Sequence, residues 1–461
     1  MELPIERHIP GSYGGRELIV VWGFWNHKAG RASLAIPVAC GIHLVGTELH
    51  AIPGLQSVPL AAHACSSSPE CSYVRKSWPF AFNFLLFAGT ATVSPFIVLY
   101  YQGLGFGGAQ IGLLAGIGPL ITLVSAPLWT GLADATHRHR AFMSASLLGG
   151  VAALAAFPFM GTFAKVFLVA MLLSFFLAPV TSFADSATMF MLADERAKYG
   201  RIRLGGSLGY GLAAPAAGIL VQRYGLNAAF WGCAVLFVMA FLISQRLIHG
   251  EAKPQPRAGG GVRSLLRNPR WPPFLAVSLA AGLVLSGLNT FFFPYMKELG
   301  AGESTMGLAL TIGVISEIPV LFFGNRLIRR LRPYGLFMAA MALSGLRLLL
   351  FAASTTPEAV LAIQGLNGLT FPAVWMAGVA YADENAPPGM NAFAQGLFGA
   401  TVMGVGMAVG GLLGGPLLET LGGRSLYLVF GVAILLTVAC VALIQRFLPA
   451  KPKEPLPMPD R

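Results

Sequence analysis

Long apolar blocks that carry almost no charge alternate with short polar loops along most of the chain. Each block is close to the ~20 residues that an α-helix needs to cross ~30 Å of hydrocarbon. This pattern predicts an all-α membrane protein with twelve transmembrane helices in two six-helix halves. The predicted spans are 79–101, 109–131, 141–160, 164–190, 204–222, 226–246, 272–296, 303–324, 334–353, 357–382, 392–415 and 425–447.

Basic residues gather in every second loop. Those after the even-numbered spans are Arg138, Arg140, Arg196, Lys198, Arg201, Arg203, Arg246, Lys253, Arg257, Arg263, Arg267, Arg270, Arg326, Arg329, Arg330, Arg332, Arg446, Lys451, Lys453 and Arg461. The opposite loops hold Lys165, Arg223, Lys297 and Arg424. Because loops rich in Lys and Arg stay on the cytoplasmic side, we expect the even-numbered loops and both termini in the cytoplasm. One missed span would break this alternation.

A polar segment at 247–271, rich in Pro, Gly and basic residues, divides the predicted spans six and six. It is expected to be a cytoplasmic linker between an N-terminal half at 77–246 and a C-terminal half at 272–448. A cytoplasmic tail at 449–461 follows.

The two halves share weak repeats. Leu104-Gly105 recurs as Leu299-Gly300, and Gly225 recurs as Gly422. Each match is weak alone, but their shared order favours two parallel six-helix repeats, a pattern typical of alternating-access transporters.

Residues 1–76 do not fit this plan. The apolar stretch 34–46 is too short to span a bilayer, and the rest shows no periodicity. We expect this extension to be disordered, or not to be translated at all. A start at Val74 would leave a short basic leader before the first span.

Composition supports a membrane location and excludes several functions. The chain is 55% hydrophobic and 11% charged, against ~25% charged residues in soluble domains, and its mean hydropathy is +0.69. The net charge of +12 lies in short loops rather than on a basic stripe, which argues against nucleic acid. No metal-ligand spacing, nucleotide loop or hydrolase motif occurs, so we expect no metal, no cofactor and no enzymatic activity.

Ionisable residues inside predicted spans are costly and therefore functional candidates. Glu317 is a candidate proton-coupling residue, because burial of a carboxyl group favours its neutral form; the alternative is a structural salt bridge. Asp185, late in the fourth span, is a second candidate for proton coupling, or a partner of Arg201 or Arg203. Arg347 is a candidate for binding an anionic substrate group or a carboxylate, or else a side chain that reaches the outer interface. A direct pair with Glu317 is not expected, because the two differ in depth by roughly 12 Å at 1.5 Å per residue.

Further polar and aromatic residues in the second half can line a substrate cavity, since such sites are largely apolar with a few polar groups. The alternative for each is packing or a place at the membrane interface. These candidates are Asn289, Gln364, Asn367, Trp375 and Tyr381.

One loop resembles a known motif. Gly131-Leu-Ala-Asp134, followed by Arg138 and Arg140, is similar to the loop between the second and third spans of the major facilitator superfamily. Ala135 stands where that family usually has an arginine. The resemblance implies a gating role for Asp134, Arg138 and Arg140.

Other stretches resemble one branch of that superfamily, which holds phenylpropionic acid permease and nucleoside–proton symporters and is related to lactose permease. They are the segments 199–209, 316–320, 365–371 and 377–381. The resemblance covers about 78–448 and implies twelve helices, a central cavity between the halves and proton-coupled uptake. Carried over by matching positions, it implies proton coupling at Glu317 and gating at Arg203. Gly205 and Asn367 depart from the usual Trp and His of that branch.

Together these features indicate a secondary active transporter, a monomer in the plasma membrane, that moves a small organic solute with protons by alternating access. Two alternatives stay open. One is an exporter that exchanges solute for protons, and the other is a membrane sensor that binds a ligand without moving it.

Overall fold

The computed structural model describes residues 22–26, 31–35, 69–192, 195, 198–250, 261–387 and 389–447. The chain divides into two compact units, Met1–Ala64 and Cys65–Arg461. In the first unit, strands β1 (Trp22–Asn26) and β2 (Arg31–Ala35) pair antiparallel, with Trp22 opposite Ala35. The disorder expected for residues 1–76 stays a prediction.

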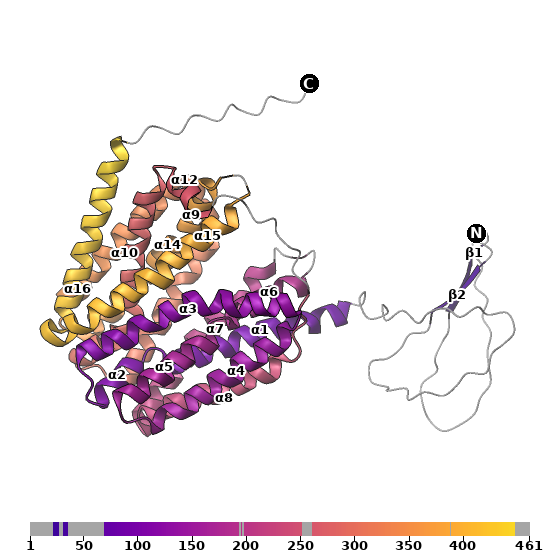
Figure 1. The fold of residues 1–461 in the computed structure, drawn as a ribbon, viewed down its shortest axis with the longest axis horizontal. Helices are drawn as coiled ribbons and strands as arrows, with labels where there is room; N and C mark the ends of the chain where they lie inside the picture. Colours follow the sequence, from indigo (N-terminus) through magenta and orange to yellow (C-terminus); the bar gives the residue numbers. More distant parts are fainter. Residues whose placement is uncertain are drawn as a thin grey trace. The chain divides into compact units, whose positions relative to one another are not determined.

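In the second unit, every regular element that the structure describes is a helix (Figure 1). The first helical half contains α1 (Pro69–Val93), α2 (Ile97–Gly103), α3 (Gly108–Thr136), α4 (His139–Ala156), η1 (Phe157–Phe159), α5 (Phe163–Leu177), α6 (Val180–Leu192), α7 (Tyr199–Tyr224) and α8 (Asn227–Ser244). The second helical half contains α9 (Gly261–Leu266), α10 (Trp271–Thr290), α11 (Phe292–Glu298), α12 (Glu303–Ala353), α13 (Pro357–Gln364), α14 (Asn367–Glu384), α15 (Asn391–Gly399), η3 (Ala400–Gly406) and α16 (Met407–Phe447).

Ten helical segments of the described residues are long and apolar enough to cross a membrane, and eleven if the bent pair α13–α14 is one span. One of these segments, Asn391–Gln445, is 55 residues long, far more than the ~20 residues of a single crossing. Gly422 lies within it at φ 75°, so the helix is broken there. The count of twelve spans and the orientation of the termini stay predictions.

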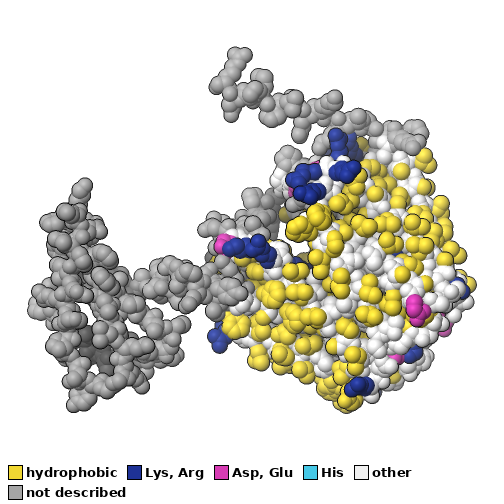
Figure 2. Space-filling view, turned by 180° about the vertical axis from the view of Figure 1, so that it is seen from behind, with side chains coloured by type: hydrophobic (Ala, Val, Ile, Leu, Met, Phe, Trp, Pro, Cys, Tyr) yellow, Lys and Arg dark blue, Asp and Glu magenta, His cyan; other side chains and the backbone are white. Residues whose placement is uncertain are grey.

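The outer surface of the helical unit is apolar. Figure 2 shows a broad hydrophobic surface on which charged side chains are few and lie mostly toward its margins. Large side chains such as Phe322 and Leu212 are 80% and 63% exposed. A soluble monomer rarely exposes apolar area on this scale, so this surface suits contact with lipid.

The weak sequence repeat corresponds to a repeated backbone conformation. Gly105 and Gly300 end α2 and α11 with φ of 78° and 85°. Gly225 and Gly422 follow α7 and the first part of α16 with φ of 81° and 75°. Positive φ is accessible to glycine without steric cost, which explains why these glycines recur at the same places in both halves.

The two helical halves pack directly against each other through α3 with α16 and α7 with α12. A Cβ added to Gly307 of α12 would lie 2.5 Å from the Ala214 carbonyl oxygen of α7, so the glycine is needed for this approach. The Gly108 N–H of α3 donates a hydrogen bond of 2.6 Å to the Glu419 carboxylate of α16. These contacts lie at the beginning of α3 and of α12, which we call the closed end.

The opposite end carries the arginine clusters, and we call it the arginine-rich end. There α3 passes into α4 next to Arg138, and α8 ends next to Arg246. In the second half, α12 is broken at Arg332, which has φ 58°. Because α3 and α12 run away from the closed end, both breaks lie at the arginine-rich end.

Candidate functional site

Arg347 is a buried charge in the second half of the molecule, with 1% of its surface exposed. Its Nη1 donates to Asn367 Oδ1 at 2.8 Å and to Thr370 Oγ1 at 3.0 Å, and its Nη2 donates to Gln364 Oε1. The guanidinium carbon lies 5.4 Å from the centre of the Phe351 ring. All four neighbours are uncharged.

The cation has no direct counter-ion. Within the described part of the chain no carboxylate forms a salt bridge with Arg347, and its Nε has no hydrogen-bond partner. An uncompensated buried charge costs several kcal/mol. The neutral acceptors offset part of that cost, and the site favours the approach of a negative or strongly accepting group.

Asn367 connects this cation to the acidic candidate. Its Oδ1 accepts from Arg347, and its Nδ2 donates to Glu317 Oε1 at 2.8 Å. The same Nδ2 lies 3.4 Å from the Gly313 carbonyl oxygen. Glu317, Asn367 and Arg347 therefore form one polar chain in which a neutral amide separates the two charges. The sequence had suggested no direct pair, and the structure supplies the bridge between them.

Local packing places Asn367 in this bridge. It is the first residue of α14, where α13 and α14 meet at a bend of 41°. The next residue, Gly368, donates its N–H to Ser316 Oγ at 2.9 Å. A Cβ on Gly368 would collide with the Ser316 carbonyl oxygen, so only glycine lets α14 begin against α12.

Glu317 also faces the first half. Thr311, on the same part of α12, donates its hydroxyl to the Gly211 carbonyl oxygen of α7 at 2.8 Å. The neighbouring Tyr210 of α7 lies close enough to Glu317 for an electrostatic interaction between the two side chains. Sequence reasoning missed Tyr210. The sequence feature that could have identified Tyr210 is its position seven residues after Arg203, which places both residues on the same face of α7, two turns apart.

A second polar cluster lies in the first half. Arg203 donates from Nη1 to Asn83 Oδ1 at 3.2 Å, and its guanidinium carbon lies 4.6 Å from the centre of the Phe87 ring. Asp185 is hydrogen-bonded by Tyr199 and interacts electrostatically with Arg203. This group ties α1, α6 and α7 together toward the arginine-rich end.

The structure brings some of the remaining candidates together and not others. Gln364 belongs to the Arg347 cluster. Trp375 packs on Phe398 at 5.4 Å and lines a small apolar cavity of about 10 Å³. Tyr381 is buried against Phe274 at 4.7 Å, and Asn289 is exposed. Trp375, Tyr381 and Asn289 make no hydrogen bond to the Arg347 cluster among the described residues.

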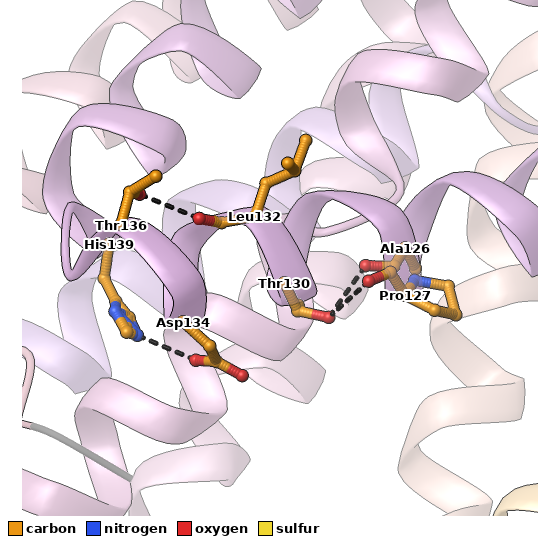
Figure 3. A network of polar contacts seen from close by, with 7 residues as sticks. All are labelled: Ala126, Pro127, Thr130, Leu132, Asp134, Thr136 and His139. Atoms are coloured by element: carbon orange, nitrogen blue, oxygen red, sulfur yellow. Dashed lines mark hydrogen bonds and ion pairs between the residues drawn. The ribbon is translucent and has the colours of Figure 1, made fainter.

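The loop candidates lie at the arginine-rich end. Asp134 accepts a hydrogen bond of 2.9 Å from His139 (Figure 3), so a histidine interacts with this aspartate where Ala135 cannot. Arg140 donates to Gln245 at the end of α8, at 3.1 Å. Arg138 precedes α4 as its N-cap residue. The described residues contain no group of three or more side chains suited to hold a metal ion.

The apolar surface, the two packed helical halves and the buried polar chain define a multi-pass helical membrane protein of the transporter class. The model of the MFS_1 like family matches residues 80–429. The chain belongs to this family.

Relatives and solved structures agree with that membership. An uncharacterized transporter, YwbF, of Bacillus subtilis (strain 168) is 27% identical over 366 residues, which are 78% of this chain and 91% of the relative. A maltose permease of Geobacillus stearothermophilus is 27% identical over 375 residues, 79% of this chain and 93% of the permease. The crystal structure of the nucleoside transporter NupG has a TM-score of 0.71 at 18% identity, and the match covers 81% of this chain and 100% of that one. At this identity the last comparison shows the fold alone.

Proposed function

We propose that the protein is a secondary active transporter that moves a small organic solute together with protons by alternating access. The observation that carries the proposal is the chain Glu317–Asn367–Arg347 beside the contact between the halves. Relatives named as a maltose permease and a multidrug resistance protein support a solute-carrying role. None of these names fixes the solute.

The polar chain gives a physical reason for coupling. While Glu317 is ionised, its carboxylate holds the Asn367 amide group, whose carbonyl oxygen in turn holds Arg347. A proton on Glu317 removes the negative charge and weakens its hydrogen bond from Asn367, since hydrogen bonds to charged acceptors are the stronger ones. Asn367 and Arg347 are then free to bind an accepting group of the solute. Protonation and solute binding therefore favour each other, and this linkage is reciprocal.

Glu317 lies where a change in its protonation can affect contacts of both helical halves. Glu317 lies on α12 six residues after Thr311, which bonds to α7, and Tyr210 of α7 lies near its carboxyl group. A change of charge there alters contacts within the second half and between the halves. Alternating access requires a difference of this kind, because a ligand shifts a conformational equilibrium only through differential interactions.

The proposal includes topology. We count twelve spans by dividing Asn391–Gln445 at Gly422, where the backbone has φ 75°. We place the arginine-rich end and both termini in the cytoplasm, because basic loops stay inside. The chain acts as a monomer.

The test is substrate-driven pH change in proteoliposomes, with a panel of aromatic acids, nucleosides and sugars. The variants are Glu317→Gln and a control, Glu358→Gln, which removes an exposed carboxyl group at the beginning of α13. Proton uptake with one solute in wild type and in the control, lost in Glu317→Gln, supports symport. Proton movement opposite to the solute supports the exporter alternative. Saturable solute binding without flux supports the sensor, and retained coupling in Glu317→Gln makes Glu317 structural.

A further inference from the structure

A basic cavity lies at the arginine-rich end of the first half, apart from the Arg347 cluster. It has a volume of about 850 Å³ and lies between the α3–α4 connection and the end of α8. Its wall includes Arg138, Arg140, Arg246, His139 and His249. Sites for small organic ligands have volumes of ~300–1,000 Å³, so the cavity is large enough for more than an inorganic ion.

Among the described residues, the hydrogen bonds that hold the wall together are made by neutral partners. Arg140 Nε donates to Gln245 Oε1 at 3.1 Å, and Gln245 Nε2 donates to Ser144 Oγ at 2.9 Å. Arg246 lies 5.7 Å from the centre of the Trp78 ring. The start of α4 is thereby tied to the end of α8 without using a carboxylate.

Asp134 opposes part of the charge of these arginines. Its carboxylate accepts from His139 at 2.9 Å (Figure 3), and 62% of its side chain is exposed. Counted over the described arginines and carboxylates of this region, Arg138, Arg140 and Arg246 outnumber Asp134 by two formal charges. A ligand with two negative charges would balance this wall.

The His249 side chain is buried beside these basic groups. Both of its ring nitrogens are buried and have no hydrogen-bond partner among the described residues. Burial, together with electrostatic repulsion from His139 and Arg140, lowers the pKa of His249 to about 4. The His249 ring is therefore neutral, and its N–H group can donate a hydrogen bond to an accepting atom of a ligand.

Backbone groups add to this preference. His137 ends α3 in the left-handed conformation at φ 55°, and α4 begins at His139. The first N–H groups of a helix have no partners within it and carry the positive end of the helix dipole. Arginine side chains bind phosphate oxygens in paired hydrogen bonds, more readily than lysine.

We propose that the cavity formed by the α3–α4 connection and the end of α8 binds a phosphate-bearing organic anion through Arg138, Arg140 and Arg246. The phosphate belongs either to an anionic lipid headgroup or to a soluble organic phosphate. Both present phosphate oxygens to the wall, with up to two negative charges on a soluble phosphate monoester and one on a lipid phosphodiester. None of the residues that line this cavity belongs to the Arg347 cluster.

The experiment has two arms on the full chain. In the first, delipidated protein in detergent is titrated with inorganic pyrophosphate by calorimetry, at low and high salt. In the second, the protein is placed in nanodiscs of phosphatidylcholine with and without phosphatidylglycerol, and retained lipid is counted by native mass spectrometry. The variants are the double substitution Arg140→Gln with Arg246→Gln, and His249→Gln separately.

Arg330→Gln is the matched control, because Arg330 is an exposed arginine at the equivalent break of the second half. We expect saturable, salt-sensitive pyrophosphate binding that weakens about tenfold for each arginine removed, with the control unchanged. Phosphatidylglycerol that is retained by wild type and lost in the double variant assigns the site to a lipid headgroup. Equal binding by the double variant and wild type, or no binding in either arm, would overturn the proposal. Each variant is first shown to be monodisperse, and His249→Gln tests the wall without removing an arginine.

Discussion

Replacing Asn367 by alanine tests the polar chain most severely, because one side chain joins both charges. The substitution removes the 2.8 Å bond from Arg347 and the 2.8 Å bond to Glu317. Hydrogen bonds to charged groups contribute ~1.5–3 kcal/mol each. Two such bonds give an upper range of ~3–6 kcal/mol. Because Glu317 is only partly buried and water can replace its lost partner, we expect a loss at the lower end, about 3 kcal/mol.

Asn227→Ala provides the matched control. It removes the same amide from the first residue of α8, where Asn227 is exposed. Unfolding is followed in detergent by the reaction of Cys233, which is 2% exposed, with a thiol-reactive fluorophore. Asn367→Ala should unfold at a clearly lower temperature than wild type and lose solute-dependent proton uptake, whereas Asn227→Ala should do neither. Equal unfolding temperatures for the two variants would refute the bridging role of Asn367.

Three further predictions concern the closed end and the basic cavity. Gly307→Ala should force α7 and α12 apart and expose the closed end to a membrane-impermeant thiol reagent at an introduced cysteine, whereas Gly335→Ala, where a Cβ meets nothing within 4 Å, should not. Glu419→Gln should weaken the 2.6 Å bond from Gly108 and shift the same labelling in the same direction by a smaller amount. In the folded protein the pKa of His249 is lowered from 6.5 to about 4. The stability that its neutral form contributes is therefore fully present above the unfolded-state pKa of 6.5 and is lost as pH falls toward the folded-state pKa of about 4. His249→Gln should flatten the dependence of the unfolding temperature on pH between these two values.

The fold followed from sequence wherever one physical rule dominated. Apolar blocks of membrane length placed the helices, because only hydrogen-bonded helices or closed barrels satisfy the backbone in lipid. The repeated glycines at Gly105 and Gly300 marked equivalent helix ends, since both take positive φ. The break at Gly422 within a continuous helical run shows why span counting is harder than finding apolar segments.

The site was less accessible from the sequence, because it depends on which helix faces meet. Glu317, Arg347, Gln364 and Asn367 were all candidates, and the structure joins all four. Their connection depends on the contact of Gly368 with Ser316, which no periodicity reveals. Asn289, Trp375 and Tyr381 were selected as polar or aromatic residues in spans; they lie outside the Arg347 cluster, and their role in substrate binding stays a prediction.

The basic cavity was also not predictable from the sequence, because it is formed by segments that are far apart in the chain. Arg138 and Arg140 were identified by resemblance to a loop motif, and Arg246 by its place in a basic loop. The hydrogen bonds that join Gln245 to Arg140 and Ser144 bring these segments together. The sequence separation of 105 residues hides this contact.

The most direct test of proton coupling separates net accumulation from exchange. For a solute found with the panel, wild type and Glu317→Gln are compared in proteoliposomes, first with an imposed pH gradient and then by counterflow without one. If Glu317 carries the coupled proton, the variant should fail to accumulate solute against its gradient yet still exchange it by counterflow. Accumulation by the variant at the wild-type level, driven by the same pH gradient, would contradict the central role of Glu317.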